Sequence, residues 1–101
     1  MSDPARPTAG ARFALERQRD DGASATYDAM IATPDAVYRS IAQLHDDGTF
    51  ELPPTGAPSE LDKQLAVIAK LTARSAAKKR EDGLPAWPAR IQRWRGPGRG
   101  E

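Results

Sequence analysis

The residues best suited to recognition chemistry lie near the C-terminal end of the chain, where tryptophans and arginines are interleaved. Trp87, Ile91 and Trp94 are spaced i, i+4 and i+7, which would place them on one face of a helix. Guanidinium groups bind phosphates or carboxylates, and indole rings stack on bases or fill an apolar groove. We therefore predict a partner-binding segment made of Trp87, Ile91, Trp94, Arg90, Arg93 and Arg95, with Arg99 beyond it.

Three roles fit this Trp/Arg segment. Arginine with interleaved tryptophan suits nucleic acid, and it also suits an anionic membrane surface. The third option is packing, in which the aromatic face contacts the domain's own core or a partner's groove while the arginines stay solvated. Packing is favoured, because two tryptophans are a large share of the apolar mass of this chain.

A second basic group precedes it. No acidic residue lies between Asp62 and Glu81, whereas solvated helix faces ordinarily mix both signs. This pattern favours a face that binds phosphates or an acidic protein over a merely solvated one. The predicted basic face consists of Lys63, Lys70 and Arg74, extended by Lys78, Lys79 and Arg80.

Catalytic chemistry has little support. His45 is the only histidine, and its neighbours Ser40, Asp46 and Asp47 belong to one expected helix rather than to a converging cleft. The chain has no cysteine and no glycine-rich phosphate loop followed by a helix. One histidine beside adjacent acids does not make a metal site. We expect no enzyme activity, no catalytic or metal-binding residues and no cofactor.

The overall charge of +1 conceals a strong asymmetry. Residues 1–62 carry five basic and eleven acidic side chains, a net of −6, and residues 63–101 carry ten basic and three acidic ones, a net of +7. Such asymmetry indicates a polyanionic partner, an acidic protein surface or self-association. It would also arise if the two halves neutralised each other, within one chain or head-to-tail in a dimer.

The length and composition predict one small domain with a weak core. Leu, Ile, Val and Phe total 15 of 101 residues, below the roughly 20% level at which a chain struggles to offset its ordering entropy. A partner or a homodimer would stabilise such a domain. There is no apolar run of the ~20 residues that a membrane helix needs, and the N-terminal residues lack the apolar stretch of a secretory signal. We expect a cytoplasmic location and no membrane partner.

We predict that the candidate binding residues are positioned by helices. Acid-acid-Gly motifs at 20–22, 46–48 and 81–83 are predicted to end these helices. Glycine just past a helix accepts a left-handed conformation, and the acids act as turn formers. Three short helices are predicted: 11–20 from its good helix formers, 24–31 from its apolar spacing, and 33–47 from a Thr33 cap. Ser59 is predicted to cap a long helix through a capping box.

The predicted fold is all-α, a small irregular bundle of three or four helices with flexible tails at both ends. Residues 1–10 form the N-terminal tail and 11–82 the helical domain. Within that domain, 11–52 is the acidic part, 53–58 a proline-rich linker and 59–82 the long basic helix. Residues 83–101 form the Trp/Arg-rich tail, in which Pro88 can start and Gly96 can end a short helix.

Residues 26–52 resemble the recognition helix and wing of winged helix-turn-helix proteins in the spacing of Thr33, Val37, Arg39, Ile41 and Leu44, followed by Gly48 and Phe50. That resemblance covers residues 26–52, about a quarter of the chain, and implies duplex binding. The acids Asp35, Asp46 and Asp47 have the wrong sign for a duplex. A capped amphipathic helix in a bundle explains the same residues and is preferred.

Two functions compete at this point. The first is a small non-enzymatic protein-interaction module, such as an accessory subunit, adaptor, inhibitor or antitoxin-like regulator. It would dock a larger protein through the long basic helix and the Trp/Arg tail. The second is a nucleic-acid-binding accessory protein that contacts phosphates through the basic segment 63–99.

Overall fold

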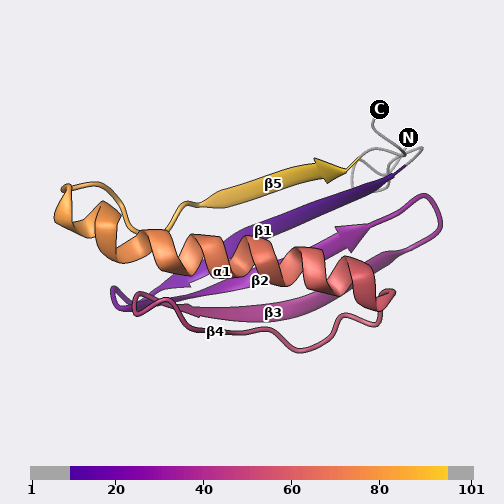
Figure 1. Cartoon of the computed structure of the whole chain (residues 1–101), viewed down its shortest axis with the longest axis horizontal. Helices are drawn as coiled ribbons and strands as arrows, with labels where there is room; N and C mark the ends of the chain where they lie inside the picture. Colours follow the sequence, from indigo (N-terminus) through magenta and orange to yellow (C-terminus); the bar gives the residue numbers. More distant parts are fainter. Residues whose placement is uncertain (1–9, 96–101) are drawn as a thin grey trace.

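The computed structural model describes residues 10–95 and shows an α+β fold (Figure 1). The strands are β1 (Ala11–Asp20), β2 (Ser24–Ala32), β3 (Val37–His45), β4 (Phe50–Glu51) and β5 (Arg90–Arg95), with one helix, α1 (Ser59–Glu81). They form one sheet of five strands in the order β4-β3-β2-β1-β5, and each neighbouring pair is antiparallel. The all-α prediction is therefore wrong. Residues 1–9 and 96–101, which hold most of the expected N-terminal tail and the end of the C-terminal one, lie outside the described range.

The segments predicted as three N-terminal helices are strands because their buried residues alternate. In β2, Ala25, Tyr27, Ala29 and Ile31 are buried, and the residues between them are only partly buried. A period of two places these four side chains on one face of a strand. Alanine, a strong helix former, fills two of these inward positions and so conceals the alternation. The expected recognition helix likewise lies in β3, so the winged-helix resemblance is wrong.

The acid-acid-Gly motifs were predicted as helix stops with left-handed glycines. The glycines are left-handed, but the motifs at 20–22 and 46–48 lie at turns between strands, and only the motif at 81–83 follows a helix. Gly22 ends the β1–β2 turn with a φ of 86°, and Gly48 ends the β3–β4 turn with a φ of 92°. In the second turn, the Asp47 carboxylate accepts hydrogen bonds from the Thr49 hydroxyl at 2.6 Å and the Thr49 N–H at 2.9 Å. These bonds favour the ionised acid and lower the pKa of Asp47.

The long helix was predicted well, but its cap was not. Helix α1 spans Ser59–Glu81, against the predicted 59–82, and follows the proline-rich segment 53–58. Pro58 occupies the N-cap position and no side chain caps the helix, so the predicted Ser59 capping box is wrong. Instead, Asp62 in the first turn accepts a hydrogen bond of 2.7 Å from the Thr55 hydroxyl, which fastens the preceding loop to the helix.

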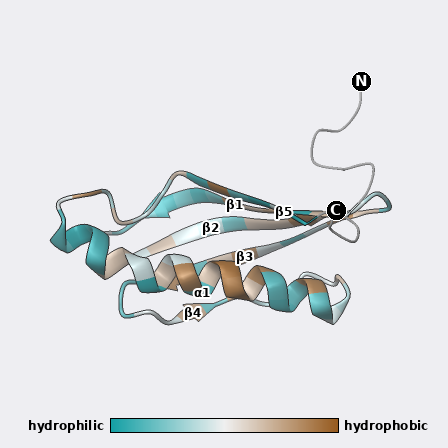
Figure 2. Cartoon of the chain, turned by 45° about the horizontal axis from the view of Figure 1, so that its top comes forward, coloured by the Kyte–Doolittle hydropathy of each residue, from teal (hydrophilic) through white to brown (hydrophobic). Residues whose placement is uncertain are grey.

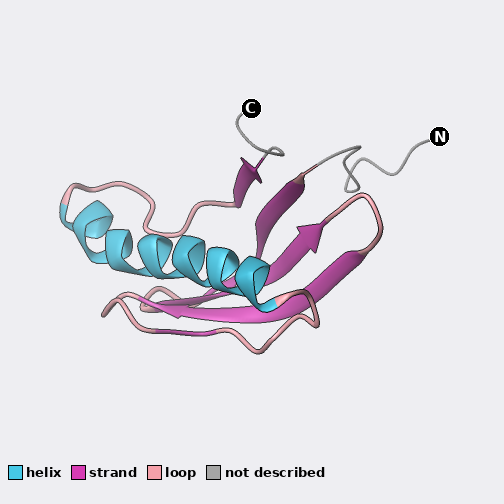
Figure 3. Cartoon of the chain, turned by 45° about the vertical axis from the view of Figure 1, so that its right-hand side comes forward, coloured by secondary structure: helices cyan, strands magenta, loops and turns pink. Residues whose placement is uncertain are grey.

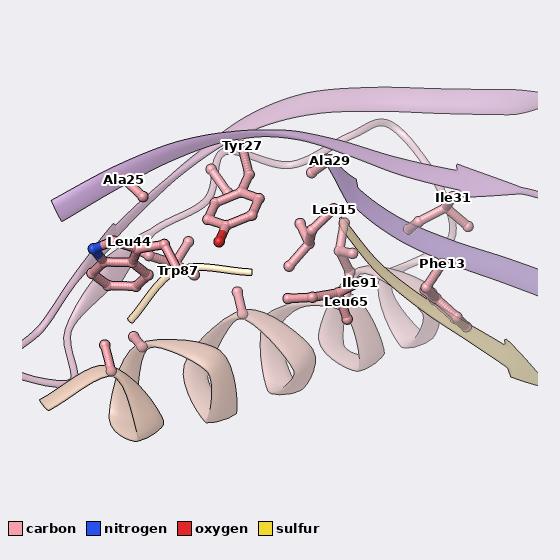
Figure 4. Close-up of a cluster of buried hydrophobic side chains, with 14 of the residues drawn as sticks. Phe13, Leu15, Ala25, Tyr27, Ala29, Ile31, Leu44, Leu65, Trp87 and Ile91 are labelled. Atoms are coloured by element: carbon pink, nitrogen blue, oxygen red, sulfur yellow. The ribbon is translucent and has the colours of Figure 1, made fainter. Parts of the chain in front are cut away.

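The core lies between α1 and one face of the sheet, as Figures 1 and 4 show. Helix α1 turns Leu65, Ala69, Ala73 and Ala76 toward the strands, and its apolar residues gather in the central turns (Figure 2). Small alanines let the helix lie close to the sheet, so the large side chains come mostly from the strands. The largest fully buried side chains are those of Trp87, Tyr27, Leu15, Ile31, Leu44 and Leu65.

The other face of the sheet carries no helix within residues 10–95 (Figure 3). An antiparallel sheet tolerates one solvated face when its outward residues are largely polar. Here the outward residues are mixed. They include the exposed apolar Ile41, at 52% exposure, and Trp94, at 58%.

Candidate interaction surfaces around strand β5

A three-residue anchor, Trp87–Ala89, positions β5 beside β1. The carbonyl oxygens of all three residues accept hydrogen bonds from the sheet: Trp87 from the Arg17 guanidinium at 2.6 Å, Pro88 from the Tyr27 hydroxyl at 2.8 Å, and Ala89 from the Arg17 N–H at 2.9 Å. Burial raises the pKa of Tyr27 to about 12, so the hydroxyl keeps its proton for this bond.

Trp87 closes the core at the end where the turns meet. Its side chain is 1% exposed, and its indole N–H donates to the Gly22 carbonyl at 2.8 Å. The side chain lies beside Leu44 in Figure 4. The packing of this tryptophan on the domain's own core is one of the options that the sequence left open.

The predicted helical face of Trp87, Ile91 and Trp94 does not form, because residues 90–95 are a strand. Ile91 is 8% exposed and faces the core, whereas Trp94 is 58% exposed and lies on the uncovered face of the sheet. Of the predicted arginines, Arg90 is on the uncovered face, and its guanidinium contacts the Glu16 carboxylate at 2.6 Å. Arg93 and Arg95 alternate with it and lie on the α1 side.

Strand β5 forms an edge of the sheet within the described residues. The bond from Arg17 N–H to the Ala89 carbonyl identifies Arg17 and Ala89 as a hydrogen-bonded pair of the β1–β5 ladder. Because bonded and non-bonded pairs alternate in an antiparallel ladder, Ile91, Arg93 and Arg95 bond with β1. The main-chain N–H and C=O groups of Arg90, Gln92 and Trp94 consequently point away from β1, toward the free edge.

A groove runs between this edge and α1. Its volume is about 350 Å³, and four consecutive β5 residues line it. Since neighbouring strand residues point to opposite faces, all four can line one groove only if the groove follows the strand's edge. The complete lining is Ile68, Leu71, Thr72, Ser75, Lys79, Pro88, Arg90, Ile91, Gln92 and Arg93.

The α1 wall of this groove was not predicted. Leu71 is a large apolar residue of the long helix, yet its side chain is 58% exposed. Helix α1 contacts β3, β2 and β4 and lies farther from β5, so the helix surface that faces β5 is left uncovered. This uncovered helix surface follows from the pairing of β5 with β1. No local pattern in the sequence indicates that pairing.

The predicted basic face of α1 is solvent-exposed and partly paired. Arg80 forms an ion pair with Asp46 in the β3–β4 turn, and Lys78 lies 3.6 Å from Asp82. In the part of the chain that the structure describes, no carboxylate lies within ion-pair distance of the remaining four cations: Lys63, Lys70, Arg74 and Lys79.

Among residues 10–95, the side chains considered for metal binding and for catalysis lie apart from one another. No group of three or more His, Asp or Glu side chains in this range could hold a metal ion. His45 lies 3.6 Å from Glu51 on the neighbouring strand, apart from Ser40, which donates to the Pro53 carbonyl. No described helix combines the length and the hydropathy of a membrane span.

Comparison of the chain with protein family models, with curated proteins and with solved structures finds no match in any of the three.

Proposed function

We propose that this chain is a non-enzymatic protein-interaction module that binds an extended acidic segment of a larger protein along the free edge of β5. The observation that carries the proposal is the edge itself: three residues, Arg90, Gln92 and Trp94, present main-chain groups that make no bond to β1, beside a groove with an apolar wall. One of these groups, the Gln92 carbonyl, accepts from the Arg93 guanidinium at 2.9 Å, a contact that an incoming strand would replace. An extended peptide that joins such an edge gains main-chain hydrogen bonds, and flanking pockets select its side chains.

The charge around the edge favours an acidic partner. Arg93 is exposed, and within residues 10–95 its guanidinium lies within ion-pair distance of no carboxylate. Lys79 lines the same groove. The apolar wall consists of Ile68 and Leu71. Alternate residues of an incoming strand would lie on the α1 side, beside the apolar wall, Arg93 and Lys79, and the residues between them would lie on the uncovered side, beside Arg90.

A second copy of the chain is a poor occupant of this edge. Antiparallel pairing of two β5 strands would bring three arginines from each strand, Arg90, Arg93 and Arg95, to one seam. Like charges placed opposite each other in a ladder destabilise it, and charged edge residues are a common protection against such self-pairing.

Proline at position 92 provides a direct test. The Gln92 N–H points to the free edge, so Gln92→Pro removes a donor needed for strand addition but no bond to β1. The matched control is Gln92→Ala, which removes the same side chain and keeps the N–H. The probe is a fluorescently labelled peptide of alternating valine and glutamate, measured by anisotropy at low salt.

We expect saturable binding to the wild type and to Gln92→Ala, and at least about fivefold weaker binding to Gln92→Pro, since the one main-chain hydrogen bond that is lost contributes roughly 1 kcal/mol. A peptide in which lysine replaces glutamate should not bind. Equal affinity of the proline and alanine variants would contradict strand addition. Tighter binding of duplex DNA than of the peptide would favour the nucleic-acid alternative.

A further inference from the structure

The uncovered face of the sheet holds a second candidate surface, separate from the groove beside α1. Two shallow hollows of about 340 and 380 Å³ lie on it and share Arg12 and Gln92. The first hollow lies over Ala14, whose short side chain leaves space between the longer ones around it. The second extends to the exposed indole of Trp94. Together they form one trough across the sheet.

The strand register shows how charge is distributed along this trough. One cross-strand row reads Trp94, Arg12, Ala32 and Val37, and the next reads Gln92, Ala14, Met30 and Arg39. Neither row contains an acidic residue. The third row contains Glu16 and Asp28. We call the first two rows the acid-free strip.

Glu16 and Asp28 also line the first hollow, and both already have partners within the sheet. Glu16 accepts from Arg90 at 2.6 Å, and Asp28 accepts from the Gln18 amide at 3.1 Å. Arg39, at the other end of the strip from Trp94, is exposed, and no described carboxylate lies within ion-pair distance of it. The strip is therefore a positively charged surface with an aromatic ring at one end.

We infer that the acid-free strip binds single-stranded nucleic acid. Exposed aromatic rings on a surface lined with arginine recognise single strands, because an unpaired base stacks on the ring while guanidinium groups contact phosphates. Trp94 supplies the stacking surface, and Arg12 and Arg39 supply the cations. A duplex keeps its bases stacked inside and could use only the charges. This inference does not depend on strand addition at β5.

The experiment is an anisotropy titration of labelled decathymidylate with the whole chain at low salt, with tryptophan fluorescence recorded in parallel. Trp87 is buried, so quenching reports on Trp94. We expect quenching on binding, at least about fivefold weaker binding for Trp94→Ala, and binding without quenching for Trp94→Phe.

A matched pair of charge reversals separates the strip from general electrostatic attraction. Arg39→Glu changes the charge on the strip, and Arg74→Glu makes the same change on α1, which covers the opposite face of the sheet. We expect at least about tenfold weaker binding for Arg39→Glu and less than about twofold for Arg74→Glu.

Three results would overturn the inference: no binding at low salt, equal affinity for a duplex of the same length, or equal losses for the two charge reversals. The Gln92→Ala and Gln92→Pro variants keep this test apart from the previous one. The proline variant can lose affinity for the acidic peptide while it binds decathymidylate as tightly as the alanine variant does. Conversely, both variants can fail to bind decathymidylate while they differ in their affinity for the peptide.

Discussion

At the scale of single residues, the two tryptophans of this chain have opposite roles although they lie seven positions apart. Trp87 is 1% exposed and hydrogen-bonded, whereas Trp94 is 58% exposed. Removing a buried aromatic side chain leaves a cavity that typically costs 3–5 kcal/mol. Removing an exposed side chain costs roughly 0.5 kcal/mol or less.

We predict that Trp87→Ala lowers the free energy of unfolding by about 3–5 kcal/mol, a large part of the stability of a domain of this size. Urea denaturation followed by circular dichroism measures the change. Trp94→Ala is the control and should unfold at nearly the wild-type midpoint. Similar losses in the two variants would contradict the burial of Trp87.

Tyr27 gives a prediction of pH dependence. Burial raises its pKa to about 12, above the ordinary value of 10.0, because the folded protein disfavours the charged phenolate. The stabilisation from the neutral hydroxyl is therefore fully present below pH 10 and is lost as the pH rises through 12. Tyr27→Phe should remove this part of the decline between pH 10 and 12.

The measurement is the free energy of unfolding of the wild type and of Tyr27→Phe across that pH range. Lysines titrate in the same interval, so the difference between the two proteins is the relevant quantity. At neutral pH, Tyr27→Phe should cost about 1 kcal/mol through the lost bond to the Pro88 carbonyl. Parallel curves for the two proteins would show that Tyr27 ionises normally.

At the scale of elements, the edge geometry of β5 predicts an alternating pattern of amide hydrogen exchange. The N–H groups of Ile91 and Arg93 bond with β1, and those of Arg90 and Gln92 point to the free edge. We expect the first pair to exchange at least about tenfold more slowly than the second, since only hydrogen-bonded amides are protected. Site-resolved exchange by NMR shows which β5 amides bond with β1. Uniform exchange rates along β5 would contradict the alternating pattern.

The glycines of the hairpin turns give a second prediction at this scale. Gly22 has a φ of 86°, with nothing within 4 Å of the position that a Cβ would take. The cost of Gly22→Ala is therefore conformational, about 1–2 kcal/mol. Asparagine tolerates the left-handed region better, so Gly22→Asn should cost less. Thermal unfolding of the two variants gives the order, and a reversed order would contradict the observed backbone.

The elements that sequence reasoning found are those with local signals. Helix α1, the 53–58 segment and the turns at Gly22 and Gly48 follow from local residue types. The strands were missed because alanines at positions such as 25 and 29 favour helix in isolation, and only the sheet makes them inward residues. Placing β5 next to β1 requires contacts between residues about 80 positions apart, for which a single sequence gives no pattern.

The candidate surfaces were predicted only in part. The arginines of β5 were identified from their density, but their division between the two faces of the sheet depends on a period of two rather than 3.6. Arg12 and Arg39 belong to the acidic half of the chain. The prediction assigned Arg12 to no surface and considered Arg39 only in the winged-helix resemblance. The cross-strand register brings them into a row with Trp94 or Gln92.

At the scale of the whole molecule, the two oppositely charged halves pack against each other within one chain. Strands β1–β4 belong to the acidic half, and α1 with β5 makes up most of the basic half. Three ion pairs join the halves: Arg80–Asp46, Arg90–Glu16 and Arg95–Glu60. All three are partly exposed, so each contributes at most about 1 kcal/mol. The charge asymmetry is thus partly structural.

The closing of the sheet by β5 predicts that the fold needs its C-terminal segment. A chain that ends at Asp82 lacks Trp87 and Ile91 from the core and leaves β1 unpaired on one side. We expect this truncated chain to show no cooperative unfolding transition, whereas a chain that ends at Arg95 should unfold like the full-length protein. A cooperative transition in the shorter chain would contradict the role assigned to β5.

The pairing of β1 with β5 also has a consequence for synthesis on the ribosome. Strand β1 leaves the exit tunnel before β2 and can pair with it as soon as β2 emerges, but its other neighbour, β5, follows only after β3, β4 and α1. Until β5 emerges, the nascent chain exposes an unpaired edge on β1, and the core lacks Trp87. In that interval this fold stays incomplete, and the chain depends on dilution or on chaperones to avoid pairing with other chains.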